Sequence, residues 1–295
     1  MAVTDPRKDP ARNVPATLAS LLDEGRALLG TDADAMIDLR QLVTGISGID
    51  RARQIIDPEQ SLSEAAATRL RRAFYDRAKG IPVAYILGAR GFWRHDFRVT
   101  PDTLIPRPET EILLEWALEL LSVDDQVTVA DLGTGSGILA VCLAVERPRA
   151  MILASDLSAG ALKVARENQQ TIVPSHPIHW FQGNWADCLA DECLDMIVSN
   201  PPYIPDDDPH LSTGDLRYEP RTALAAGLDG LDDYRVLFAE AVRVLKPGGH
   251  ILVEHGFDQS AAIMALLTQV GFTSLITRSD YAGLPRTTGG HKPGR

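Results

Sequence analysis

The chain has 295 residues, 40 of them acidic and 29 basic, which gives a formal net charge of −11 at pH 7. This length suits two domains with a sizeable core, and the negative charge gives no support to a broad electrostatic contact with nucleic acid. The three cysteines, the absence of metal-ligand spacing and a longest apolar run of only Ile138–Val145 favour a reduced, cytoplasmic protein without a metal site or membrane contact.

The first part of the chain, residues 1–85, is predicted to be a small helical bundle. Its first fifteen residues mix charges and prolines and have the pattern of neither a signal nor a transit peptide. Ser61 or Ser63 is expected to cap the last helix and Gly80 to end it. The helical patterns cover residues 17–30, 32–43 and 61–80. We interpret this part as a packing or interaction module without chemistry of its own.

Residues 86–108 are rich in glycine, proline and aromatic side chains, which predicts a linker with a short β-hairpin. From residue 109 to 295 helical and strand patterns alternate, which predicts a doubly wound, mostly parallel sheet. The predicted strands are 127–132, 151–157, 178–183, 194–199, 250–256 and a final pair near 273–280 and 285–290. The predicted helices are 109–121, the segment after residue 137, 158–170, 231–249 and 259–272.

A glycine loop follows the first strand of this alternating part. Gly133, Gly135 and Gly137 let the backbone turn tightly and approach a ligand without a Cβ in the way. Asp156 ends the next strand, 23 residues after Gly133, where an acidic side chain can accept both ribose hydroxyls. The pattern predicts a nucleoside-containing ligand. Its glycine spacing differs from the dinucleotide fingerprint, which disfavours an NAD-dependent dehydrogenase.

The segment Val198–Pro205 reads VSNPPYIP and follows a buried strand. Pro201 and Pro202 have a fixed φ and no N–H, and Asn200 before them is restricted to extended backbone. The carbonyls of Asn200 and Pro201 therefore lack ladder partners and are available to a ligand. An ordinary proline-rich turn would have the same residues, so this segment alone leaves both interpretations open.

Together the motifs VADLGTGSG, ASDLS and SNPPY resemble those of class I S-adenosyl-methionine-dependent methyltransferases that act on planar nitrogens. The segments IPRPETE, YEPRTALAAGLDGLDDYR and VLKPGGHILVEHGFDQ are similar to the peptide chain release factor protein-(glutamine) methyltransferase family, the PrmC/HemK type. The resemblance runs from about Ile81 to Arg286 and is weaker in the helical part. It implies a Rossmann-like, mostly parallel seven-stranded sheet with a small N-terminal helical bundle.

The resemblance implies methyl transfer to the glutamine of the Gly-Gly-Gln loop in class 1 release factors, with the helical domain helping to hold that partner. We expect a monomer. The family's cofactor contacts fall on Gly133, Thr134, Gly135, Ser136, Gly137, Asp156, Trp185 and Asn200. Its substrate contacts fall on Asn200, Pro201, Pro202 and Tyr203, with Asn200, Pro201 and Tyr203 as the catalytic group.

Three further residues have no single role at this stage. Arg107 and Glu109 are expected either at the domain junction or against ligand, and Glu219 is expected to order the long loop over the site. Trp185 is interpreted as a surface beside the adenine, with an ordinary core aromatic as the alternative.

Two other kinds of function fit parts of the sequence. An adenine amino-methyltransferase on DNA or RNA shares the Asn-Pro-Pro-Tyr motif, but residues 81–295 carry 28 acidic and only 17 basic side chains. A catalytically inactive binding fold would have no need for the glycine loop, Asp156 and the Asn-Pro-Pro-Tyr segment together. Binding of S-adenosyl-homocysteine, measured separately from turnover, distinguishes that alternative from an enzyme.

Overall fold

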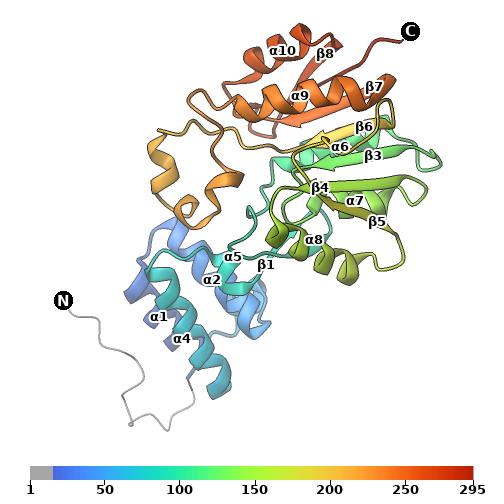
Figure 1. The fold of residues 1–295 in the computed structure, drawn as a ribbon. Helices are drawn as coiled ribbons and strands as arrows, with labels where there is room; N and C mark the ends of the chain where they lie inside the picture. Colours follow the sequence, from blue (N-terminus) through green and yellow to red (C-terminus); the bar gives the residue numbers. More distant parts are fainter. Residues whose placement is uncertain (1–15, 295) are drawn as a thin grey trace. The chain divides into compact units, whose positions relative to one another are not determined.

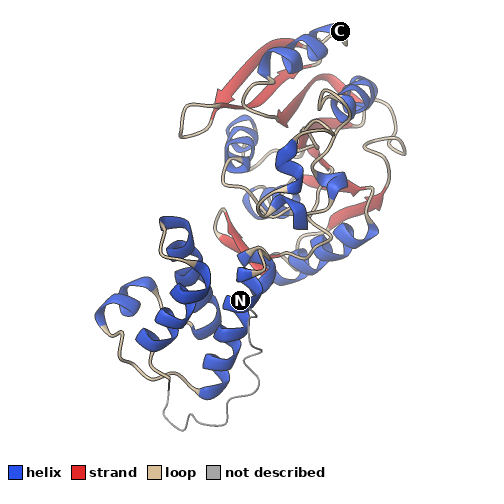
Figure 2. Cartoon of the chain, turned by 90° about the vertical axis from the view of Figure 1, so that its left-hand side faces the viewer, coloured by secondary structure: helices blue, strands red, loops and turns tan. Residues whose placement is uncertain are grey.

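The structure is a computed structural model that describes residues 16–294. The chain divides between Leu87 and Gly88 into two compact units (Figure 1). Strands occur in the second unit, whereas the described part of the first is built from helices (Figure 2). No helix among residues 16–294 combines the length and apolar character needed to span a bilayer.

The described part of the first unit contains three helices that the sequence predicts and two short ones that it does not. Each of the longer helices has a side-chain N-cap, and Ser63, rather than Ser61, caps α4. Gly25 allows close packing, since a Cβ there would lie 2.4 Å from Leu39 Cδ2. The bounds are α1 Leu18–Leu29, α2 Ala33–Ser47, α3 Arg51–Ile56, α4 Glu64–Ala78 and α5 Val83–Leu87. Buried leucines and Phe74 fill the space between them.

The second unit begins with the predicted hairpin, in which β1 (Ala89–Phe92) pairs antiparallel with β2 (His95–Arg98). Trp93 lies in its turn. Its backbone N–H donates to Glu111 (2.8 Å) and its indole N–H to Glu146 (2.8 Å). These bonds hold the hairpin against the helices of the same unit.

The main sheet confirms the predicted class of fold. In the described part of the chain it has seven strands in the order β5-β4-β3-β6-β7-β9-β8. The first five run parallel, while β9 pairs antiparallel with both β7 and β8. The bounds are β3 Thr128–Leu132, β4 Met151–Asp156, β5 Ile178–Gln182, β6 Leu194–Ser199, β7 Leu245–Glu254, β8 Thr273–Ser279 and β9 Pro285–His291.

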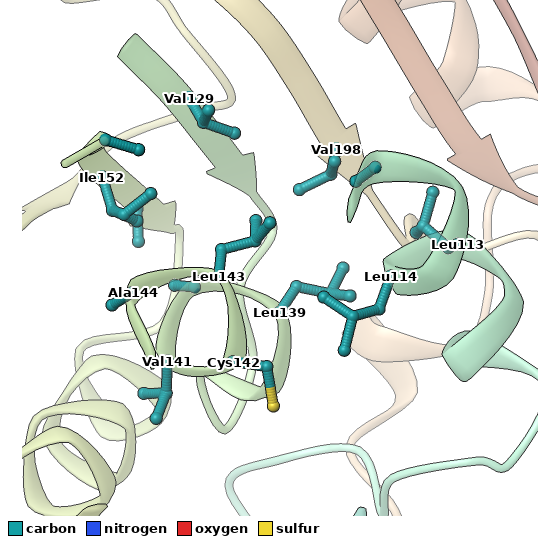
Figure 3. Packing of buried hydrophobic residues seen from close by; sticks show 14 of the residues in the cluster. Leu113, Leu114, Val129, Leu139, Val141, Cys142, Leu143, Ala144, Ile152 and Val198 are labelled. Carbon is teal, nitrogen blue, oxygen red and sulfur yellow. The ribbon is translucent and has the colours of Figure 1, made fainter. Parts of the chain in front are cut away.

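Helices cover both faces of the sheet. On one face α6 (Thr110–Leu120) and α7 (Ile138–Glu146) pack on the strands, and α8 (Ala159–Ile172) lies beside α7. Figure 3 shows Leu139 of α7 beside Leu114 of α6, with Leu143 directed toward the strands. On the other face α9 (Asp232–Val244) and α10 (Ser260–Gln269) bury Tyr234 and Phe238.

Two details differ from the sequence prediction. Leu245–Gly249 belong to β7, not to the helical segment, because Leu245 already pairs with Leu194 across a register shift in β6. The long loop after β6 contains three 3₁₀ turns, η2 Pro209–Ser212, η3 Leu216–Tyr218 and η4 Arg221–Ala223. These turns shape the segment that passes over the carboxyl end of the sheet.

Candidate active site

A cavity of about 340 Å³ opens at the carboxyl ends of β3, β4 and β6. This edge is where parallel α/β sheets bind ligands. Most of the cofactor residues predicted from the sequence lie in its wall. The lining residues predicted as cofactor contacts are Gly133, Thr134, Gly135, Ser136, Asp156, Trp185 and Asn200. Gly137 is not in the lining, whereas Pro202, predicted as a substrate contact, is.

The glycine loop has left-handed backbone at each glycine, with φ of +75° at Gly133, +57° at Gly135 and +84° at Gly137. A Cβ on Gly137 would lie 2.9 Å from the Cβ of Ala165, so packing against α8 also requires glycine. A Cβ on Gly135 would meet nothing within 4 Å. Since Gly135 lines the cavity, this open space is available to a ligand.

Asp156 is held in place by two backbone N–H groups. Gly135 donates to its Oδ2 (2.9 Å) and Ser158 donates to its Oδ1 (2.8 Å). Burial raises the pKa of this carboxyl, and the backbone donors oppose that rise. Each oxygen keeps a further lone pair, so the carboxylate can also accept hydroxyl donors from the cavity.

Trp185 lies in the wall directly under the glycine loop. A Cβ on Gly133 would approach its ring to 3.0 Å, and the Trp185 carbonyl accepts a bond from Ser155 Oγ (2.9 Å). Only 8% of the side chain is exposed. The ring therefore combines core packing with a surface on the cavity.

Asp131, at the end of β3, is a site residue that the motif analysis missed. Its Oδ2 accepts bonds from Thr134 Oγ1 (2.5 Å) and from the Ala140 N–H (3.0 Å). Its Oδ1 is buried and has no partner among the described residues. Burial raises the pKa of Asp131 to about 7. Asp131 lines the cavity, and its unpartnered oxygen has the capacity to accept a further donor.

Asn200 follows β6 and is half-buried. Its Nδ2 donates to Thr110 Oγ1 at 3.2 Å. The loop hydrogen bonds of residues 16–294 include none to the carbonyl oxygens of Asn200 or Pro201. Asn200 lines the cavity, and the pairing of its side-chain oxygen with the Pro201 carbonyl as acceptors stays a prediction.

Pro201 and Tyr203 are not among the residues that line the cavity. Tyr203 is held through its backbone, since its N–H donates to Leu224 (3.2 Å) and its carbonyl accepts from Gln259 Nε2 (2.9 Å). Burial raises the pKa of its phenol. These contacts hold the backbone of Tyr203, and its side chain does not line the cavity.

Glu219 ties the long loop to the opposite wall of the cavity. Its side chain is fully buried, pairs with the guanidinium of Arg107 and accepts a bond from the Ile105 N–H (2.9 Å). Burial raises the pKa of Glu219, and the nearby Arg107 charge opposes this rise. Glu109 immediately precedes α6 and makes no side-chain cap there.

Further lining residues come from segments outside the predicted cofactor and substrate contacts. They come from the stretch before α6, from the first residue of α6 and from the long loop: Asp102, Thr103, Leu104, Pro106, Arg107, Thr110, Pro220, Thr222 and Ala223. Across the described chain, no group of three or more His, Cys, Asp or Glu side chains is arranged to hold a metal ion.

The parallel sheet, the glycine loop and the paired acidic residues at the strand ends define a methyltransferase of the Rossmann-like class. In agreement, residues 110–215 match the family model described as methyltransferase small domain, and residues 20–88 match the PrmC N-terminal domain. A solved methyltransferase from Pyrococcus furiosus superimposes with a TM-score of 0.51 at 16% identity, covering 77% of this chain and 99% of that one. This likeness supports the fold.

Curated relatives specify the family. The release factor glutamine methyltransferase of Xylella fastidiosa strain Temecula1 is 45% identical over 90% of this chain and 96% of its own length. The enzyme of that name from Coxiella burnetii is 44% identical over 85% of this chain and 89% of its own length. The one from Burkholderia pseudomallei is 42% identical over 95% of this chain and 98% of its own length. The chain belongs to the release factor glutamine methyltransferase family.

Proposed function

We propose that this protein transfers a methyl group from S-adenosyl-methionine to the side-chain amide nitrogen of the glutamine in the Gly-Gly-Gln motif of class 1 peptide chain release factors. Membership of the family supports the reaction and the kind of acceptor. The observation that carries the proposal is the engaged amide of Asn200, which lines the cavity. Asn200 Nδ2 is engaged by Thr110, which leaves Oδ1 and the Pro201 carbonyl for a planar NH₂ group.

The residues around the cavity fit a sulfonium nucleoside. Asp156 would accept the ribose hydroxyls, Trp185 would flank the adenine, and the open space beside Gly135 would admit the ligand close to the backbone. The buried, unpartnered Oδ1 of Asp131 would accept a donor from the amino-acid end. When bound, S-adenosyl-methionine supplies a methyl group made electrophilic by its positively charged sulfur.

The contribution of the chain itself is orientation. An amide nitrogen is a poor nucleophile because its lone pair is delocalised into the carbonyl. If Asn200 Oδ1 and the Pro201 carbonyl each accept one N–H, the lone pair is directed toward the methyl donor. Aligning two reactants in this way can lower the barrier by about 7–11 kcal/mol. The alkylated nitrogen becomes strongly acidic, so we assign no proton-abstracting residue.

Pro201 and Pro202 have locked φ angles, which limits the backbone freedom of the segment that carries the two acceptor groups. Stacking of the Tyr203 ring on the acceptor amide stays a prediction, since that ring is not part of the cavity wall. We further propose that residues 1–85 help to hold the release factor, that residues 86–108 link the two parts, that residues 109–295 carry the chemistry, and that the enzyme acts as a monomer.

A transfer assay with labelled S-adenosyl-methionine tests this proposal against nucleic-acid acceptors. The purified protein is incubated with an unmethylated class 1 release factor, with the same factor carrying Gln→Ala in the Gly-Gly-Gln loop, and with adenine-containing DNA and RNA. We expect label only in the first reaction. Label in DNA or RNA, but not in the release factor, would replace the proposal with the adenine alternative.

A further inference from the structure

A buried carboxylate lies beside Asn200 and has no assigned role. Glu254 ends β7 and is only 2% exposed. Because Ser199 of β6 and Val253 of β7 are paired in the parallel ladder, Asn200 and Glu254 leave neighbouring strands at the same edge of the sheet. Glu254 does not line the cavity, so direct contact with ligand does not explain it.

Thr110 connects these two residues. It begins α6, is fully buried, and its Oγ1 accepts the bond from Asn200 Nδ2. The Thr110 hydroxyl and the Asn200 amide both lie near the Glu254 carboxyl and favour its ionised form, whereas burial raises its pKa to about 7. Glu254 Oε2 is buried without a partner in the part of the chain that the structure describes, so the carboxyl has spare accepting capacity.

The chemistry of this group determines the orientation of the amide. A hydroxyl can donate or accept, so Thr110 alone would tolerate either end of the Asn200 side chain. Above its pKa of about 7 the Glu254 carboxyl is ionised and only accepts, so it then favours the NH₂ end of Asn200 facing Thr110 and Glu254. The Oδ1 end is then directed away from Glu254, as the proposed reaction requires. A flipped amide would present N–H donors to the N–H donors of the substrate.

We propose that Glu254 is a positioning residue that, together with Thr110, orients the Asn200 amide so that Oδ1 faces the acceptor nitrogen. The inference rests on the proposed function and deepens it. Glu254 acts through Asn200 and does not touch substrate. Replacing its carboxylate by an amide removes the preference, because a glutamine side chain can donate to Oδ1 as well as accept from Nδ2.

The test compares full-length Glu254→Gln with the parent protein in methyl transfer to an unmethylated class 1 release factor. Since a misaligned group near the chemistry costs roughly 100-fold, we expect kcat to fall about 10–100-fold. We expect KM for the release factor and the Kd for S-adenosyl-homocysteine to stay within about threefold, because Glu254 touches neither ligand. A purely structural role would instead lower thermal stability and weaken cofactor binding.

A second pair of variants keeps the test independent of the folding of Glu254→Gln. Thr110→Val removes the hydroxyl at similar volume and should lower kcat, whereas Thr110→Ser keeps the hydroxyl and should recover most of that loss. If Glu254→Gln turns over at the parent rate, or Thr110→Ser is as slow as Thr110→Val, the positioning role is overturned. If the parent protein binds S-adenosyl-homocysteine but transfers no methyl, the proposed function fails, and this inference with it.

Discussion

Two glycines of the same loop are expected to respond differently to alanine. Gly137 and Gly135 both have left-handed backbone, which costs a residue with a Cβ about 1–2 kcal/mol. At Gly137 the new methyl would also lie 2.9 Å from Ala165 Cβ and 3.2 Å from Trp180 Cη2. Overpacking of this kind adds about 1–3 kcal/mol. We therefore expect Gly137→Ala to lower the free energy of unfolding by roughly 2–5 kcal/mol, and Gly135→Ala by only about 1–2 kcal/mol.

The affinity for S-adenosyl-homocysteine should change in the opposite order to stability, with the larger loss in Gly135→Ala. The methyl of Gly135→Ala would occupy the open space on the cavity side, and a clash of 1–3 kcal/mol there weakens a ligand by about 5–150-fold. Urea unfolding gives the stability of each variant, and calorimetry gives the affinity for S-adenosyl-homocysteine below the unfolding transition. Equal losses of stability in the two variants, or parental affinity in Gly135→Ala, would refute the reasoning.

Four further changes test other parts of the structure. Arg107→Met leaves the buried Glu219 carboxylate without its guanidinium partner and should destabilise the protein by about 3 kcal/mol. Residues 206–224 should then be cleaved faster by protease. Resistance equal to that of the parent protein would contradict this. Glu254 has a folded-state pKa raised by burial to about 7, so the folded protein keeps a proton that the unfolded chain releases, and stability falls as pH rises from about 4.5 to 7. Glu254→Gln should remove this pH dependence and raise the free energy of unfolding by on the order of 3 kcal/mol at pH 8 but by little at pH 5. An equal rise at both pH values would argue against the raised pKa of Glu254. Gly25→Ala places a Cβ 2.4 Å from the Leu39 side chain of α2 and should destabilise the helical unit by about 1–3 kcal/mol, measured from its unfolding transition. S-adenosyl-homocysteine should bind as tightly as to the parent protein. Weakened binding would count against two units that are stable independently. Asn200→Ala removes one of the two proposed acceptors of the substrate amide and should lower kcat about 100-fold or more, with a much smaller change in cofactor affinity. Comparable losses in the two measurements would exclude the assigned role.

Strong local patterns explain why most of the fold was predictable. The central strands β3 and β6 are largely buried and appear as short branched apolar runs, while the helices between the strands are longer. The glycine loop and Asp156 were recognisable because they follow the carboxyl ends of strands, where parallel α/β sheets bind ligands. By contrast, α3 and α5 are only six and five residues long, too short to show periodicity.

The side-chain contacts of the site that the sequence does not reveal join distant segments. Thr110 and Asn200 are 90 positions apart, and Arg107 and Glu219 are 112 apart, so no local pattern links them. Glu254 reads as the polar end of an apolar strand. The role of Glu254 becomes visible only when β7 is paired with β6, which brings the buried Glu254 carboxyl beside Asn200.

Peptide mass spectrometry tests the central claim most directly. A purified, unmethylated class 1 release factor is incubated with this protein and S-adenosyl-methionine, and its peptides are compared with those of a Gln→Ala acceptor treated in the same way. The account predicts one added methyl on the glutamine of the Gly-Gly-Gln loop and none on the control. An unmodified glutamine, under conditions where S-adenosyl-homocysteine binding is demonstrated, would contradict it.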